Sequence, residues 1–271
     1  MTTKQMTTKQ TIFAWPDKCL EQTHTVEQSI LIVSGCSFTD ACGYTTVPIT
    51  WPGYAKERCG FDYVIDVSSG GCGNDYIATS IVNQIESMTA DELKQSLVLI
   101  MWTGVDRQEL PTYTDDPAHW EGYIDGVRYI RGNQLSINSV SDGVARGEAL
   151  RSWKNIMLTQ NYLENKGVPF GFSFYINEFD PPFIPRRDLT KEFFGMLAPA
   201  KIEQLRHCRW IHPFNDSPFE WAFYQKDNLF EPDGFHLSPN GHLRWTDNIL
   251  LPNLVKMGLS SPVDKKKSFI V

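Results

Sequence analysis

An aspartate and a histidine three residues apart, Asp233 and His236, form the segment of this sequence best suited to chemistry. They lie in the run Asp-Gly-Phe-His, which is typical of a loop, and a helix-like pattern follows it. A histidine can take the proton of a serine hydroxyl when a carboxylate holds its imidazole in the right tautomer. Ser37, far upstream, follows an apolar run and supplies such a serine. These three residues make the chain a candidate hydrolase.

Short apolar runs predict the elements that must bring these residues together. We expect five buried strands of a parallel sheet, at residues 29–34, 63–67, 97–102, 169–176 and 209–211. Apolar residues at helical spacing between these strands predict two helices. One spans residues 74–88, with Asn74 as its cap, and the other spans 148–166 and ends before Gly167. Strands that alternate with helices predict an α/β fold, a three-layer α/β/α sandwich around a doubly wound parallel sheet.

The ends of the predicted strands carry polar and glycine residues. Ser37, Gly71 and Asp106 each follow a strand, and ligands of such sheets bind beyond the carboxyl ends of the strands. We therefore expect the three to lie at one edge. Ser37 is expected to open a helix, where its own N–H would face a developing oxyanion.

The length of the chain, 271 residues, favours one large domain. Two polar segments near 111–147 and 177–204 are expected to be insertions over the active edge, since long loops are usually functional. Trp120 in the first of them is a candidate for contact with substrate. The expected division is an N-terminal extension, the domain and a C-terminal tail, at 1–28, 29–258 and 259–271.

Composition narrows the class of partner. The net charge is −7, and the one dense basic cluster, residues 265–267, lies in the tail, which argues against binding of nucleic acid or an anionic membrane. No apolar run approaches the roughly 20 residues that span a bilayer, and no signal peptide is evident. Six cysteines without a C-x-x-C pair predict reduced thiols in a cytoplasmic protein and no zinc site. No cofactor is expected.

Three blocks of the sequence resemble those of the SGNH hydrolase superfamily, the GDSL-type esterases, in the same order and over most of the chain. They are Gly35-Cys-Ser-Phe-Thr39, Gly70-Gly-Cys-Gly-Asn-Asp75 and Asp233-Gly-Phe-His236. The resemblance implies a flavodoxin-like sandwich, no metal, and ester or acyl hydrolysis through an acyl-enzyme. It assigns Ser37 as nucleophile, His236 as base, Asp233 as the residue that orients it, and Gly71 as an N–H donor of the oxyanion hole.

Two positions depart from that pattern. Cys36 stands where the family usually has an aspartate before the serine, and Val105 stands where its third block has an oxyanion-hole asparagine. Loss of one such donor costs about 10²–10³ in turnover. Thr103 or a nearby backbone N–H is the expected substitute. Asn74 and Arg107 are candidates for substrate binding, and the alternative for Arg107 is an ion pair with its neighbour in the sequence.

Two functions follow from these residues. The first is a serine esterase whose substrate is a small or carbohydrate ester, with a carbohydrate O-acetyl group as one candidate. The alternative is a scaffold that has lost its chemistry and serves as a binding or structural module, in a homo-oligomer or a larger, virion-like assembly. In that case Ser37 would be a helix N-cap and Asp233 and His236 part of a surface turn. A hydrogen bond between Ser37 and His236 would favour the enzyme.

Overall fold

The structure is a computed structural model of the chain. It describes residues 30–40, 50–105, 107, 109–112, 123–124, 127–131, 142–176, 197–212 and 216–260.

A parallel sheet of four strands forms the centre of the molecule. The strands are β1 (Ile30–Ser34), β2 (Tyr63–Asp66), β3 (Ser96–Trp102) and β7 (Phe170–Phe174), in the order β2-β1-β3-β7. Strands β3 and β7 are buried along their whole length, as are the last four residues of β1, because helices cover both faces. The predicted α/β fold with a parallel sheet is confirmed.

The fifth strand predicted at 209–211 is reduced to a single parallel bridge between Trp210 and Phe172. The Trp210 N–H donates to the carbonyl of Cys208, two residues back, at 2.8 Å. This bond turns the chain, so that only one residue continues the sheet.

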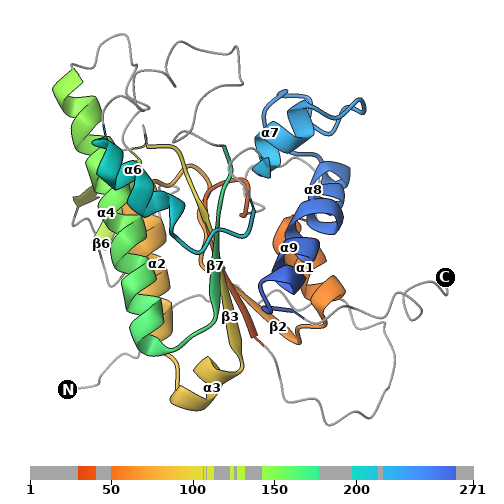
Figure 1. Cartoon of the computed structure of the whole chain (residues 1–271), viewed down its shortest axis with the longest axis horizontal. Helices are drawn as coiled ribbons and strands as arrows, with labels where there is room; N and C mark the ends of the chain where they lie inside the picture. The colour runs from red at the N-terminus through yellow and green to blue at the C-terminus, as the bar shows by residue number, and fades with distance from the viewer. Residues whose placement is uncertain are drawn as a thin grey trace, which may run out of the picture.

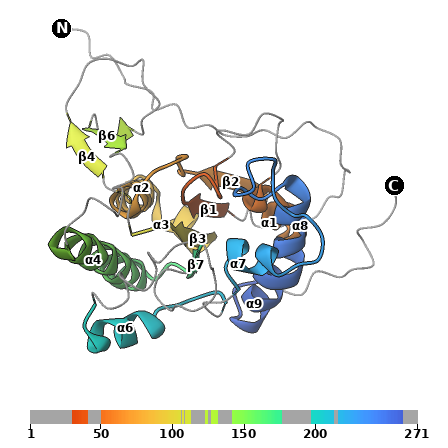
Figure 2. The same cartoon turned by 90° about the horizontal axis from the view of Figure 1, so that it is seen from above.

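Helices form a layer on each face of the sheet (Figures 1 and 2). On one side lie α2 (Asn74–Glu86), α4 (Asp142–Lys166) and α6 (Pro199–Arg206). On the other lie α1 (Trp51–Cys59), α8 (Pro239–Trp245) and α9 (Leu251–Lys256), with a π-helical turn, Thr246–Leu250, between the last two. The short helix α3 (Ala90–Lys94) leads into the amino end of β3, and α7 (Pro218–Phe223) lies near the opposite end of the sheet.

Helices α2 and α4 follow the spacing of their apolar residues. Ile77, Ile81 and Ile85 are buried, which places one face of α2 against the sheet. Helix α4 starts six residues before the predicted 148 and ends where predicted: Gly167 has φ +67°, and the next N–H donates to the carbonyl of Leu163 at 3.3 Å.

Large aromatic side chains join the layers. Trp102 and Phe172 pack edge to face with ring centroids 5.5 Å apart, which locks β3 to β7. Trp51 and Trp245 are 6.2 Å apart and link α1 to α8. All four side chains are almost completely buried, so the helix that follows His236 is anchored in the core.

A second, antiparallel sheet lies in the segment predicted to be the first insertion. It consists of β4 (Glu109–Thr112), β5 (Tyr123–Ile124) and β6 (Val127–Arg131), in the order β4-β6-β5. Most of the predicted second insertion, 177–196, lies outside the described residues, as do 1–29 and 261–271.

Within the described ranges, no helix combines the length and apolar character needed to cross a membrane. No group of three or more His, Cys, Asp and Glu side chains in the same ranges is placed to hold a metal ion. The four cysteines described, Cys36, Cys59, Cys72 and Cys208, carry free thiols.

Candidate active site

Ser37 lies in a tight turn directly after β1. The N–H groups of Thr39 and Asp40 both donate to the carbonyl of Cys36, at 2.8 and 2.9 Å. The side chain of Phe38 is completely buried, whereas Ser37 keeps part of its surface exposed. The helix that we expected to begin at Ser37 therefore does not start there, and residues 41–49 lie outside the described residues.

This turn depends on the glycine before it. A Cβ on Gly35 would lie 2.2 Å from Oγ1 of Thr39 and 3.0 Å from the carbonyl oxygen of Met101. Thr39 is itself fixed, because Nε1 of Trp51 donates to its hydroxyl at 3.3 Å. The close approach of the turn to β3 thus requires a residue without a side chain.

His236 is presented by a compact loop that leads into α8. The loop closes through an antiparallel bridge between Phe230 and Leu237 and through the N–H of Glu231, which donates to the His236 carbonyl at 2.8 Å. Gly234, with φ +68°, forms the tip of the loop. These backbone hydrogen bonds fix the position of His236, so its side chain is not needed to hold the loop together.

The structure brings Ser37, His236 and Asp233 into one hydrogen-bonded chain. Nε2 of His236 lies 2.8 Å from the Ser37 hydroxyl, and Nδ1 lies 2.6 Å from Oδ2 of Asp233. Because an ionised carboxylate only accepts hydrogen bonds, Nδ1 carries the ring proton and Nε2 can accept the proton of the serine.

Asp233 is held as an anion. Desolvation acts to raise its pKa, but the hydrogen bond with the His236 ring and those from the backbone N–H groups of Phe235 and His236 outweigh it, so the pKa lies below the ordinary value. The ring of His236 is further enclosed by Phe38 and Phe235, with centroids at 5.4 and 5.2 Å. The His236 ring is therefore held by the Asp233 carboxylate on one side and packed between two aromatic rings.

Gly71 lies in the loop after β2 with φ +74°. Its N–H makes no hydrogen bond to any part of the chain that the structure describes, whereas the N–H groups of four neighbours are all engaged. Ser68 donates to Asp66, Ser69 to Gly35, Gly70 to Asp40 and Cys72 to Ser69, at 2.9, 3.1, 2.8 and 3.2 Å. Of the N–H groups of residues 68–72, that of Gly71 thus has no acceptor among the described residues and can bind a negative oxygen.

Thr103 and Asn74 face one another behind this loop. Nδ2 of Asn74 donates to the Thr103 carbonyl at 3.1 Å and to the Ser152 hydroxyl at 3.0 Å, and its Oδ1 accepts the Thr103 N–H at 2.9 Å. The amide is thus occupied and buried, which leaves it no bond for a substrate. Gly73, not Asn74, occupies the N-cap of α2. The Thr103 hydroxyl is buried without a hydrogen-bond partner in the described part of the chain.

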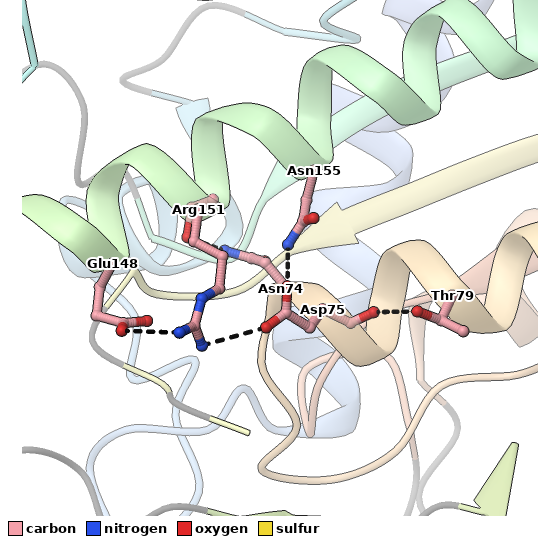
Figure 3. A network of polar contacts seen from close by, with 7 residues as sticks. Asn74, Asp75, Thr79, Glu148, Arg151 and Asn155 are labelled. Carbon is pink, nitrogen blue, oxygen red and sulfur yellow. Dashed lines mark hydrogen bonds and ion pairs between the residues drawn. The ribbon is translucent and has the colours of Figure 1, made fainter. Parts of the chain in front are cut away.

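A polar network ties the start of α2 to α4 (Figure 3). Asp75 accepts hydrogen bonds from Asn155 at 2.6 Å and from Arg151 at 3.3 Å, and Arg151 also pairs with Glu148. Because Asp75 follows Asn74 directly, this network also fixes Asn74, whose amide bonds to Thr103 at the end of β3.

Val105 and Arg107 follow the end of β3. Val105 is almost completely buried and has no polar side-chain atom, so its side chain cannot donate a hydrogen bond to a ligand. The Arg107 guanidinium donates to the Cys72 carbonyl at 3.3 Å and lies 5.3 Å from the centroid of the Tyr175 ring. It thus borders the Gly71 loop. Trp120 and Asp106 lie outside the described residues.

Asp66 was not singled out from the sequence. Although the residue keeps some exposed surface, desolvation of its carboxyl raises its pKa to about 7, against the lowering effect of the Ser68 hydrogen bonds. The sequence feature that could have indicated a perturbed carboxyl is an aspartate at the end of an otherwise apolar strand.

His242 is fully buried on α8. Desolvation lowers its pKa to about 3, and the neighbouring His236 lowers it further in the same direction. A third histidine, His212, lies 2.6 Å from the Ser173 hydroxyl, but both residues are buried and away from solvent. Among the described residues, only the pair of Ser37 and His236 combines a serine–histidine hydrogen bond with partial exposure.

Neither a family model nor a curated protein matches the sequence. Among solved structures, the chain is similar to the lipase Lip_vut3 from a goat rumen metagenome, with 13% sequence identity and a TM-score of 0.51, over 86% of this chain and 99% of the lipase. It is also similar to the salicylyl-acyltransferase SsfX3 of a tetracycline biosynthetic pathway, at 14% identity and a TM-score of 0.46, over 89% and 57% of the two chains. At these identities the similarity shows the fold alone.

Proposed function

We propose that the protein is a serine ester hydrolase of the SGNH type, in which Ser37 is the nucleophile, His236 the general base and Asp233 the residue that orients it. One observation carries the proposal: the continuous hydrogen-bonded chain from the Ser37 hydroxyl through both nitrogens of His236 to the Asp233 carboxylate. The similarity of fold to a lipase is consistent with this chemistry.

The proposed reaction has two halves. Oγ of Ser37 attacks the ester carbonyl while its proton passes to Nε2 of His236, and the resulting imidazolium is stabilised by Asp233. The bond to the alcohol then breaks, and His236 gives its proton to the leaving oxygen. Water, deprotonated by the same nitrogen, hydrolyses the acyl-enzyme and releases the acid with Ser37 restored.

The negative oxygen of the tetrahedral intermediate needs donors. Gly71 supplies its open N–H, and the Thr103 hydroxyl, which has no partner among the described residues, is the second candidate. With Val105 in the third block, no asparagine side chain adds to them. We therefore expect slow turnover, about 10²–10³ below that of an enzyme with the full set of donors.

As substrate we propose an O-acetyl ester of a carbohydrate. Phe223 and Tyr224, at the end of α7, are 41% and 54% exposed, and this helix lies near the end of the sheet that carries Ser37. Exposed aromatic side chains there give a sugar ring an apolar surface to rest on.

Hydrolysis of p-nitrophenyl acetate and of acetylated oligosaccharides by the purified protein tests this function. Ser37→Ala and His236→Ala should abolish it, while His207→Ala, which removes an exposed histidine at the C-cap of α6, should not. Equal rates for the wild type and Ser37→Ala would refute the proposal.

The second candidate is a binding or structural module without catalysis, and the apolar Val105 in the third block favours it. This function predicts self-association or incorporation into an assembly. Mass measurements over a range of protein concentrations test it, since a strict monomer that hydrolyses esters would contradict it.

A further inference from the structure

Asp40 connects the turn of the nucleophile to the loop of Gly71. It lies three residues after Ser37, at the end of the same turn, and its N–H donates to the Cys36 carbonyl at 2.9 Å. Its carboxylate reaches away from the turn, and Oδ2 accepts the N–H of Gly70 at 2.8 Å. One residue is thus held by its backbone on one side of the site and by its side chain on the other.

The contact from Asp40 is made to the residue next to the open N–H of Gly71. Gly70 immediately precedes Gly71, and glycine restricts its own backbone less than any other residue. Without external bonds, two consecutive glycines would let the Gly71 N–H point in many directions. The rest of the loop is held at Ser69, whose N–H donates to the Gly35 carbonyl at 3.1 Å, and at Cys72, whose thiol donates to the same carbonyl at 3.2 Å.

We propose that Asp40 is a positioning residue, whose carboxylate fixes Gly70 and thereby directs the Gly71 N–H toward the oxygen that becomes negative above Ser37. This inference rests on the proposed esterase function. It assigns to Asp40 no contact with substrate. An oxyanion donor that is already oriented costs no reorganisation during the reaction, so the contact should act on turnover more than on substrate binding.

Three variants of Asp40 separate the hydrogen bond from the bulk of the side chain. Asp40→Asn keeps an acceptor oxygen at the same reach, Asp40→Ser keeps polarity but is too short, and Asp40→Ala removes both. The control is the same series at Asp91, a carboxylate on α3 that is 85% exposed and distant from the site. The ester is p-nitrophenyl acetate.

We expect Asp40→Ser and Asp40→Ala to lower kcat about 10- to 100-fold, somewhat less than loss of a whole donor, and to change KM less than about threefold. Asp40→Asn should retain most of the wild-type kcat, and the Asp91 variants all of it. If Asp40→Ala does not fold, the kcat values of Asp40→Ser and Asp40→Asn alone test the proposal. Unchanged kcat in the Ser variant, or equal loss in Ser and Asn, overturns the proposal.

A second measurement does not depend on catalysis. The Gly70 amide hydrogen should exchange slowly in the wild type and in Asp40→Asn, and at least about tenfold faster in Asp40→Ser, because its acceptor is gone. If the chain hydrolyses no ester but this difference appears, the proposed function fails and the tie of Asp40 to Gly70 stands. If hydrolysis depends on Ser37 but Gly70 exchanges alike in all variants, the role of Asp40 fails alone.

Discussion

Asp233 holds His236 at two points. Oδ1 of the carboxylate accepts the backbone N–H of the histidine at 3.0 Å, while Oδ2 lies 2.6 Å from Nδ1 of its ring. The spacing of three residues makes both contacts possible within one loop. The same carboxylate therefore sets where the histidine stands and which of its nitrogens carries the proton.

The variant Asp233→Asn separates these two tasks. An asparagine can still accept the backbone N–H groups through its oxygen, but its NH₂ group can donate to Nδ1 and favour the wrong tautomer. We expect kcat for p-nitrophenyl acetate to fall about 10³–10⁴-fold with little loss of stability. Thermal unfolding of the same preparation is the control. Retention of more than about a tenth of the wild-type kcat would contradict the assigned role.

Asp66 should make stability depend on pH. Its folded pKa is raised to about 7, above that of the unfolded chain, so its contribution to the free energy of unfolding is fully present below about pH 4 and is lost as pH rises through 7. Asp66→Asn keeps an acceptor for Ser68 and cannot ionise. Relative to the wild type, it should gain about 1–3 kcal/mol between pH 4 and 8. Urea unfolding at a series of pH values measures the difference, and a difference constant with pH would count against it.

His242 should act in the opposite direction. Burial lowers its folded pKa to about 3, below the ordinary 6.5, so its contribution is present above pH 6.5 and is lost as pH falls toward 3. His242→Gln removes this titration, and the stability of the variant relative to wild type should rise as pH falls, by about 2–4 kcal/mol in total. The same urea series tests it. A relative stability that stays level below pH 6 would show that the histidine is not kept neutral by the fold.

Gly241 allows a test of the packing beneath the His236 loop. A Cβ at this position of α8 would lie 2.3 Å from the carbonyl oxygen of Leu229, which already accepts the Ser238 N–H at 2.9 Å. Gly241→Ala should destabilise the protein by about 1–3 kcal/mol. It should also weaken ester hydrolysis, because Leu229 must move away from the new methyl group and the His236 loop moves with it.

The matched control is Gly147→Ala on α4, where nothing lies within 4 Å of the new methyl group. That variant should be neutral or more stable by up to about 1 kcal/mol, because alanine is the better helix former. Equal melting temperatures for the two variants would show that α8 does not pack on Leu229 as described.

The central sheet could be predicted from the sequence because its strands are short, and three of the four, β1, β3 and β7, are apolar and almost wholly buried. The strand at Ser96–Trp102 is one such run, and its limits differ from the prediction by one residue. That Ser37 and Gly71 lie at one edge of the sheet was expected because each follows a predicted parallel strand, and β1 and β2 are neighbours in the sheet. Both inferences depend on patterns that are local or that the topology of the fold imposes.

The roles of individual polar residues could not be predicted in the same way. Asn74 looked like a helix cap because its type favours that position, yet its amide is taken by Thr103 and Ser152, which lie 29 and 78 residues further along the chain. The bond from Gly70 to Asp40 is equally non-local. Such partners are set by distances between loops, which no spacing in the sequence encodes.

The contact between Ser37 and His236 spans 199 residues of chain and joins the first described strand to the segment just before α8. During synthesis the serine therefore leaves the ribosome long before its base exists. Until the loop that carries His236 has been made and has packed beside the Ser37 turn, the hydroxyl has no histidine to accept its proton. In the proposed enzyme, Ser37 could not attack an ester until His236 has been synthesised and packed beside it, so a fragment that ends before His236 should be inactive.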